Sequence, residues 1–196
     1  VHKEYPEGYK WIELKANKNL PSEDDGFGNM SSPGYNELEK ALKYEGDTMG
    51  HCVGGYCPDV YEGRSRIFSL RDAKNEPHVT IEVRPGMTPK EQAARGMREI
   101  GGHIDKIIQI KGKGNAKPKK NYIPYVQDFV KSGNWSDVGD IQNADLMRVK
   151  EHAAKGIGSQ YVTEQEFKKW LDTQNPSAGM ARGGITHKAE GGNVQP

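Results

Sequence analysis

The clearest structural signal in this chain is the segment Arg66-Ile-Phe-Ser-Leu-Arg-Asp-Ala-Lys-Asn-Glu-Pro-His-Val-Thr-Ile-Glu-Val83. Apolar and polar residues alternate along both of its halves, as they do in strands that have one buried face. Its middle, Asp72-Ala-Lys-Asn75, is rich in residues that favour tight turns. We therefore predict a β-hairpin over residues 66–83.

Two more segments alternate in the same way and extend the predicted sheet. Residues 9–15 alternate around Trp11, and residues 106–111 alternate isoleucine with polar residues. Short helices are predicted between and after these strands. The sequence therefore predicts an α+β fold, in which a small antiparallel sheet packs with short helices and a C-terminal helix is appended.

The helices are predicted from their end signals. Ser32-Pro33 is typical of a helix start, and Gly46 is expected to end that helix, after which Asp47 would cap a second short helix through Cys52. Residues 88–100 and 122–130 also favour helices. Near the C-terminus the spacing of Thr163 and Glu166 predicts a capping box. These signals indicate where a helix begins or ends, but they do not indicate what it packs against.

The predicted domains follow from these elements. Residues 1–140 are predicted to form the α+β domain, and residues 141–175 a helical C-terminal extension. Within this extension, residues 150–160 are expected to link the C-terminal helix to the α+β domain. Residues 176–196 are rich in glycine and are predicted to be a flexible tail. Because the chain starts with Val1, we expect it to be a piece of a longer polypeptide or a processed polypeptide.

Composition excludes several classes. Lys and Arg number 28 against 27 Asp and Glu, so overall charge argues neither for nor against a nucleic-acid partner. No apolar run approaches the roughly 20 residues that span a bilayer, so no membrane partner is expected. The only cysteines, Cys52 and Cys57, lie too close together for a disulfide framework, which predicts a reducing compartment.

Strand periodicity groups the candidate catalytic residues. His78, Thr80 and Glu82 share one face of a predicted strand, and Gln109 and Lys111 share a face of the next. If the segment that carries Cys52 lies over that face, the side chains that would meet in one cleft are Cys52, His51, His78, Glu82 and Gln109. The alternative for Ser69, Arg71 and Thr80 is an ordinary solvated sheet face.

Cys52 itself has three possible roles. As a nucleophile it needs a base, and His78 is easier to place than His51, because successive residues of a helix point about 100° apart. Gln109 or Asn115 would then donate to an oxyanion, and Glu82 would orient the imidazole. As a metal ligand, Cys52 would join Cys57 and one or two of His51, His78 and His103. It would otherwise be a buried structural thiol.

A lysine cluster provides a second candidate function. Residues 106–120 contain six lysines and no acidic residue, and their centre is Lys111-Gly-Lys-Gly-Asn115. Such a loop suits phosphates, with Tyr122 and Tyr125 nearby to stack on bases. The candidate phosphate or nucleic-acid ligands are Lys111, Lys113, Asn115, Lys117, Lys119 and Arg71. The alternative is a solvated basic loop.

Four motifs occur in order along the chain: Met49-Gly-His-Cys-Val-Gly-Gly-Tyr56, Arg66-Ile-Phe-Ser-Leu-Arg71, Thr80-Ile-Glu82 and Gln109-Ile-Lys-Gly-Lys-Gly-Asn115. Over roughly residues 8–131 the chain resembles the PcfJ-like family, which carries a His-Cys-Val motif and occurs in conjugative plasmids, phages and prophages. The matched polar positions are His51, Cys52, Tyr56, Glu82, Gln109 and Asn115. His78 falls between the motifs.

The resemblance implies a domain of a larger phage or plasmid protein, located in the bacterial cytoplasm or in a virion. It implies no particular reaction and no cofactor. The leading expectation is an accessory or effector domain with a site centred on Cys52 and His51. The alternatives are a nucleic-acid-binding module without catalysis, which uses the lysine cluster, and a structural virion or interaction domain.

Overall fold

The computed structural model describes residues 1–20, 23–24, 30–31, 33–94 and 104–175, and the chain divides into two compact units, Val1–Met147 and Arg148–Pro196. The first unit ends a few residues after the predicted boundary at 140. The predicted tail, 176–196, lies outside the described residues. Each unit is described by itself below.

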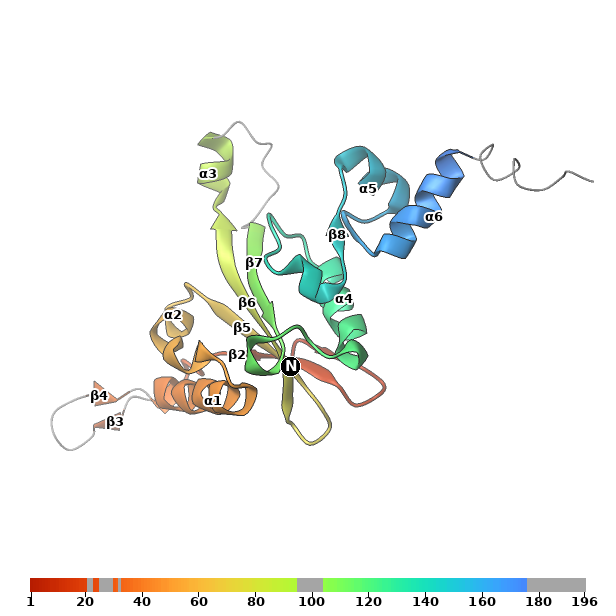
Figure 1. The fold of residues 1–196 in the computed structure, drawn as a ribbon. Helices are drawn as coiled ribbons and strands as arrows, with labels where there is room; N and C mark the ends of the chain where they lie inside the picture. The colour runs from red at the N-terminus through yellow and green to blue at the C-terminus, as the bar shows by residue number, and fades with distance from the viewer. Residues whose placement is uncertain (21–22, 25–29, 32, 95–103, 176–196) are drawn as a thin grey trace, which may run out of the picture. The chain divides into compact units, whose positions relative to one another are not determined.

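The centre of the first unit is a five-stranded antiparallel sheet in the order β1-β2-β5-β6-β7 (Figure 1). Its strands are β1 (Lys3–Glu4), β2 (Lys10–Leu14), β5 (Arg66–Arg71), β6 (Pro77–Met87) and β7 (Ile104–Lys111). The hairpin β5–β6 and both flanking strands stand where the sequence predicts them. The α+β fold is therefore confirmed. Two further short strands, β3 (Glu23–Asp24) and β4 (Met30–Ser31), pair with each other.

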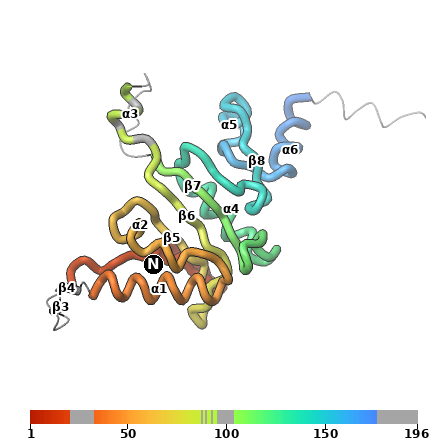
Figure 2. Tube along the Cα trace, turned by 60° about the vertical axis from the view of Figure 1, so that its left-hand side comes forward, coloured from red at the N-terminus to blue at the C-terminus, as the bar shows by residue number. Residues whose placement is uncertain are grey.

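Helices cover both faces of this sheet (Figure 2). The helices of this unit are α1 (Pro33–Met49), α2 (Cys57–Tyr61), α3 (Pro89–Ala94), which follows the end of β6, and α4 (Ile123–Ser132), with 3₁₀ turns η1 (Cys52–Gly55), η2 (Lys113–Asn115), η3 (Lys120–Tyr122) and η4 (Ile141–Ala144). Ile67 of β5 packs with Leu38 and Leu42 of α1 on one face. Phe68 turns to the other face and meets the Phe129 ring of α4 at 5.0 Å.

The polar face of the hairpin is therefore buried beneath α1. Ser69, Arg71, Thr80 and Glu82 are each less than 5% exposed. A buried polar group must find hydrogen-bond partners inside the protein. The alternative of a solvated sheet face is wrong for these residues, because α1 and η1 cover them.

The end of α1 differs from its prediction. Gly46 does not end the helix, which runs on to Met49, and Asp47 caps no second helix. The helix ends instead at Gly50, whose φ is +68° and whose amide donates to the Gly46 carbonyl at 2.8 Å. A Cβ on Gly46 would lie 2.9 Å from the His51 carbonyl oxygen. Glycine at 46 thus lets the chain that follows α1 fold back against it.

The outer edge of β7 is paired with a later part of the chain. Residues 135–140 carry Val138, which forms a parallel bridge to Ile107. The Ile107 amide donates to Asp137 at 3.0 Å, and the Gly139 amide donates to the Ile107 carbonyl at 2.8 Å. A Cβ on Gly139 would lie 2.1 Å from the Ile108 carbonyl oxygen. Only glycine permits this close approach.

The second unit contains α5 (Glu151–Ile157), α6 (Glu164–Gln174) and β9 (Tyr161–Val162), and β9 pairs with β8 (Met147–Arg148) at the boundary of the unit. The predicted capping box of Thr163 and Glu166 is present at the start of α6. Residues 150–160, predicted to link the C-terminal helix to the main domain, consist mostly of helix α5. Among the described residues, no helix is long and apolar enough to cross a membrane.

Candidate active site

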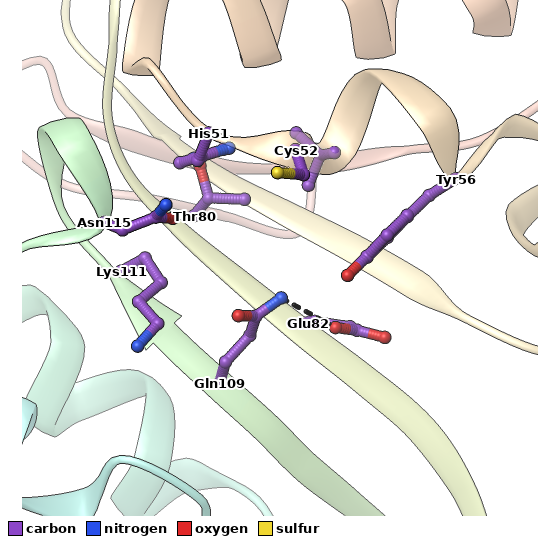
Figure 3. Close-up of a pocket in the computed structure, with 9 residues that line it drawn as sticks. His51, Cys52, Tyr56, Thr80, Glu82, Gln109, Lys111 and Asn115 are labelled. Carbon is purple, nitrogen blue, oxygen red and sulfur yellow. Dashed lines mark hydrogen bonds between the residues drawn. The ribbon is translucent and has the colours of Figure 1, made fainter.

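A cavity of about 360 Å³ opens in the first unit between the turn that follows α1 and the strands β6 and β7 (Figure 3). Its lining residues are His51, Cys52, Val53, Tyr56, Thr80, Glu82, Gln109, Lys111 and Asn115. Four of the five predicted catalytic residues line it together. It also contains two residues of the predicted phosphate group, Lys111 and Asn115.

A chain of hydrogen bonds through strand β6 to helix α1 holds His51 in place. Its Nε2 lies 2.9 Å from Thr80 Oγ1, and the Thr80 hydroxyl donates to Glu45 Oε1. Because Thr80 has one hydroxyl proton and gives it to Glu45, its oxygen accepts the proton on His51 Nε2. We infer that Nδ1 is the unprotonated nitrogen. Burial lowers the pKa of His51, a hydrogen bond with its own backbone raises it by less, and the ring is neutral at pH 7.

Glu45 is the buried anchor of this chain. It has no solvent exposure, and its Oε2 accepts from Ser69 Oγ at 2.9 Å and from Arg71 Nη2 at 2.7 Å. Burial raises the pKa of Glu45, and the donors Thr80, Arg71 and Ser69 work in the opposite direction. The paired guanidinium compensates the buried carboxylate.

Sequence reasoning did not identify Glu45, although a signal for it was present. Leu38, Leu42, Glu45 and Met49 recur at helical spacing and form one face of α1. A carboxylate on an apolar helix face needs a partner from the element beneath it. The hydroxyl-bearing strand face supplies that partner.

Arg71 does not have the role that was expected for it. It is 3% exposed, and its guanidinium donates to Glu45, to Ser69 Oγ at 2.7 Å and to the Asn75 carbonyl at 2.9 Å. A phosphate at the protein surface would not reach it. Arg71 instead balances the charge of Glu45.

The two free thiols have different environments. Cys52 is exposed at the start of η1, and its sulfur points toward the His51 ring in Figure 3. Cys57 is buried, lies 3.8 Å from the Tyr35 carbonyl oxygen, and has a pKa raised by burial. The interpretation of Cys52 as a buried structural thiol is therefore wrong. Among the described residues, no group of three His, Cys, Asp or Glu side chains is placed to hold a metal ion, and His103 lies outside them.

Glu82 orients Gln109 and not an imidazole. The buried Glu82 carboxylate accepts from Gln109 Nε2 at 2.8 Å, from Ser65 Oγ at 3.1 Å and from Arg84 Nε at 2.7 Å. One amide hydrogen of Gln109 is thus used by Glu82, and the other remains for a ligand. The expected contact of Glu82 with a histidine is not formed, because Thr80 lies nearest to His51.

Lys111 and Asn115 form the last side of the cavity, and the charge of Lys111 is partly neutralised. Lys111 pairs with Asp140 at 3.0 Å. Asn115 adopts a left-handed conformation with φ of 59°, directly after Gly114 at 66°. In Figure 3 the Asn115 amide lies on the side of the cavity nearest His51. Asn115 and Gln109 therefore present amide groups to the same space.

His78 lies in a different cavity, with Lys113, Lys117 and Lys119. The cause is a register shift in the hairpin, where Leu70 pairs with Val79 but Arg71 pairs with Pro77. This irregularity interrupts the alternation that would place His78 with Thr80. The convergence of His78 with Cys52, expected from periodicity, is not observed.

Comparison of this chain with protein-family models, with curated proteins and with solved structures found no match. The resemblance to PcfJ-like proteins therefore rests on the four quoted motifs. The function has to be argued from the geometry of the cavity.

Proposed function

We propose that the cavity lined by His51 and Cys52 is the active site of a domain that uses the Cys52 thiolate as a nucleophile. The observation that carries this proposal is the hydrogen-bonded chain His51–Thr80–Glu45, because the exposed thiol of Cys52 lines the same cavity as His51. Nucleophile, base and a third group that orients the base form the arrangement that activates such residues. Here the orienting carboxylate acts through a hydroxyl.

The proposed reaction class is acyl transfer. Neutral His51 takes the Cys52 thiol proton at Nδ1, and the sulfur then attacks a carbonyl carbon of the substrate. The electron pair of the carbonyl moves to its oxygen, where the free amide hydrogens of Gln109 and Asn115 donate. When the tetrahedral intermediate collapses, the leaving group receives the proton from His51. Thr80 and Glu45 stabilise the intervening imidazolium.

The test compares the two thiols within one chain. Iodoacetamide labelling is followed at each cysteine by peptide mass spectrometry from about pH 5 to pH 9, in the native chain and in His51→Gln. At pH 7, His51→Gln should slow the labelling of Cys52 at least about tenfold and leave the slow labelling of the buried Cys57 unchanged. A Cys52 rate that follows an ordinary thiol pKa of about 8.5 in both proteins would overturn the proposal.

We also propose that the chain serves as an accessory or effector domain of a phage or conjugative-element protein. The ordered succession of the four motifs supports this context. In a mobile element that encodes the chain, Cys52→Ala should lower transfer or phage yield, while Cys57→Ser at the buried thiol serves as the comparison. Equal transfer by the native and Cys52→Ala elements would exclude a role that depends on the thiol.

A further inference from the structure

The second cavity of the first unit has a volume of about 350 Å³. Its lining residues are Thr48, Glu76, Pro77, His78, Lys113, Ala116, Lys117, Lys119 and Tyr122. The turn η2 separates it from the first cavity, because Lys111 and Asn115 line one and Lys113 and Ala116 line the other. Gly114 of this turn packs 3.7 Å from where a Cβ on Gly50 would lie, at the end of α1.

The charges that line the second cavity are mostly positive. Lys113, Lys117 and Lys119 face one carboxylate, Glu76. Lys117 also pairs with Asp145. In the part of the chain that the structure describes, no carboxylate forms an ion pair with Lys113 or Lys119. The cavity therefore retains positive charge for an anionic ligand.

An aromatic wall stands beside these lysines. The rings of His78 and Tyr122 are stacked, with centroids 4.6 Å apart and planes at 17°. Asp72 Oδ2 lies 3.0 Å from His78 Nε2 and fixes the ring. Tyr9 meets both rings edge-on, at 6.1 Å from His78 and 5.9 Å from Tyr122. The wall is thus held in place before any ligand arrives.

We propose that the second cavity binds one nucleotide unit of a single-stranded nucleic acid. The phosphates that flank this unit lie on Lys113, Lys117 and Lys119, and its base lies against Tyr122. Lysines that follow the backbone and aromatic rings that stack on bases are the two components of such sites. The bases of a duplex are stacked inside the helix and do not reach an aromatic wall. This site is independent of Cys52.

Binding is measured by fluorescence anisotropy of a labelled oligothymidylate of about 12 nucleotides, against a duplex and an inorganic polyphosphate with the same number of phosphates. With three lysine contacts, the association constant should fall about twentyfold between 50 and 200 mM salt. The single strand should bind at least about tenfold more tightly than either competitor. Equal affinity for the three polyanions would overturn the proposal.

Charge variants locate the site. Lys113→Glu and Lys119→Glu should each weaken single-strand binding about tenfold. Lys40→Glu on α1 makes the same charge change at an exposed position outside the cavity and should change binding less than about twofold. If Lys40→Glu weakened binding as much as Lys119→Glu, only the overall charge would be at work, and the site would be rejected.

Aromatic variants test the base contact. Tyr122→Leu should weaken single-strand binding about tenfold and leave polyphosphate binding unchanged, while Tyr122→Phe should retain binding. Thermal melting checks that each variant is folded, and the Phe variant remains informative if the Leu variant is not. A free mononucleotide that competes as well as the oligomer would overturn the assignment to a strand. Cys52→Ala should bind normally, which separates this proposal from the thiol chemistry.

Discussion

His51 and Thr80 lie 29 residues apart in sequence and meet at 2.9 Å between Nε2 and Oγ1. The contact ties the turn after α1 to strand β6 of the sheet. His51 has extended backbone angles, φ of −145° and ψ of 172°, and stands just before η1. The divergence of neighbouring helical side chains therefore does not apply to His51 and Cys52. The adjacent pair can share one cavity without a break in a helix.

Removing the Thr80 hydroxyl should uncouple the base from Glu45. Thr80→Val keeps the shape of the side chain, but it removes both the acceptor for His51 and a donor to the buried carboxylate. We expect Cys52 alkylation at pH 7 to slow about tenfold. The same iodoacetamide labelling of Thr80→Ser, which retains a hydroxyl, should give a rate near that of the native chain. A native rate in Thr80→Val would show that the relay has no influence on the thiol.

Acid should destabilise the fold partly through His51. Burial lowers the pKa of His51 below its value of about 6.5 in the unfolded chain, so the unfolded state binds the proton first as pH falls. Neutral His51 makes its whole contribution to the free energy of unfolding above about pH 6.5. This contribution is lost as the pH falls from there to the lower pKa of the folded state. Urea unfolding should show a smaller loss between about pH 7.5 and pH 5 in His51→Gln than in the native chain. Identical losses would contradict this pH dependence.

The buried pair of Glu45 and Arg71 should behave as a unit. Arg71→Met leaves an unpaired buried carboxylate and should cost about 3–5 kcal/mol of unfolding free energy. Glu45→Leu leaves an unpaired guanidinium and should cost about as much. The double variant should be clearly more stable than the sum of the two losses implies, as measured by urea denaturation. Additive losses would mean that the pair is not coupled.

Gly46 should tolerate no side chain, although alanine is usually the better helix residue by about 1 kcal/mol. A Cβ at this position would lie 2.9 Å from the His51 carbonyl oxygen and 3.1 Å from the Gly54 amide nitrogen. We expect Gly46→Ala to lower the melting temperature and to slow Cys52 alkylation. Gly55 has open space around its missing Cβ, so Gly55→Ala is the matched control. Stabilisation by Gly46→Ala would refute the close approach.

The predictable part of the fold comes from local patterns. Alternation located β5, β6 and β7, and the capping residues located the start of α6, because each pattern depends on neighbours in sequence. A glycine at position 46 is compatible with two structures: the end of a helix, or a helix interior that another segment approaches closely. Only the tertiary contact with His51 decides between them. The local rule therefore misplaced the helix end by about one turn.

The candidate site likewise contains some residues that the sequence locates and others that it does not. Strand alternation predicts that Glu82 and Gln109 lie in one cleft. The structure pairs the two residues directly across the adjacent strands β6 and β7. His78 was misplaced because the hairpin irregularity at Leu70 and Arg71 leaves no mark on the alternation. Glu45 was missed because a glutamate on a helix is usually solvated. Its burial depends on partners that lie in another element.

The pairing of residues 136–139 with β7 has a consequence for the behaviour of the chain at high concentration. The outer strand of a sheet carries unpaired backbone groups that recruit strands from other molecules. Here the Ile107 amide and carbonyl are already bonded, and the Asn143 amide donates to the Ile110 carbonyl at 2.7 Å. At the opposite edge, β1 has two residues, Lys3 and Glu4, both charged. The sheet is thereby protected at both margins against edge-to-edge association.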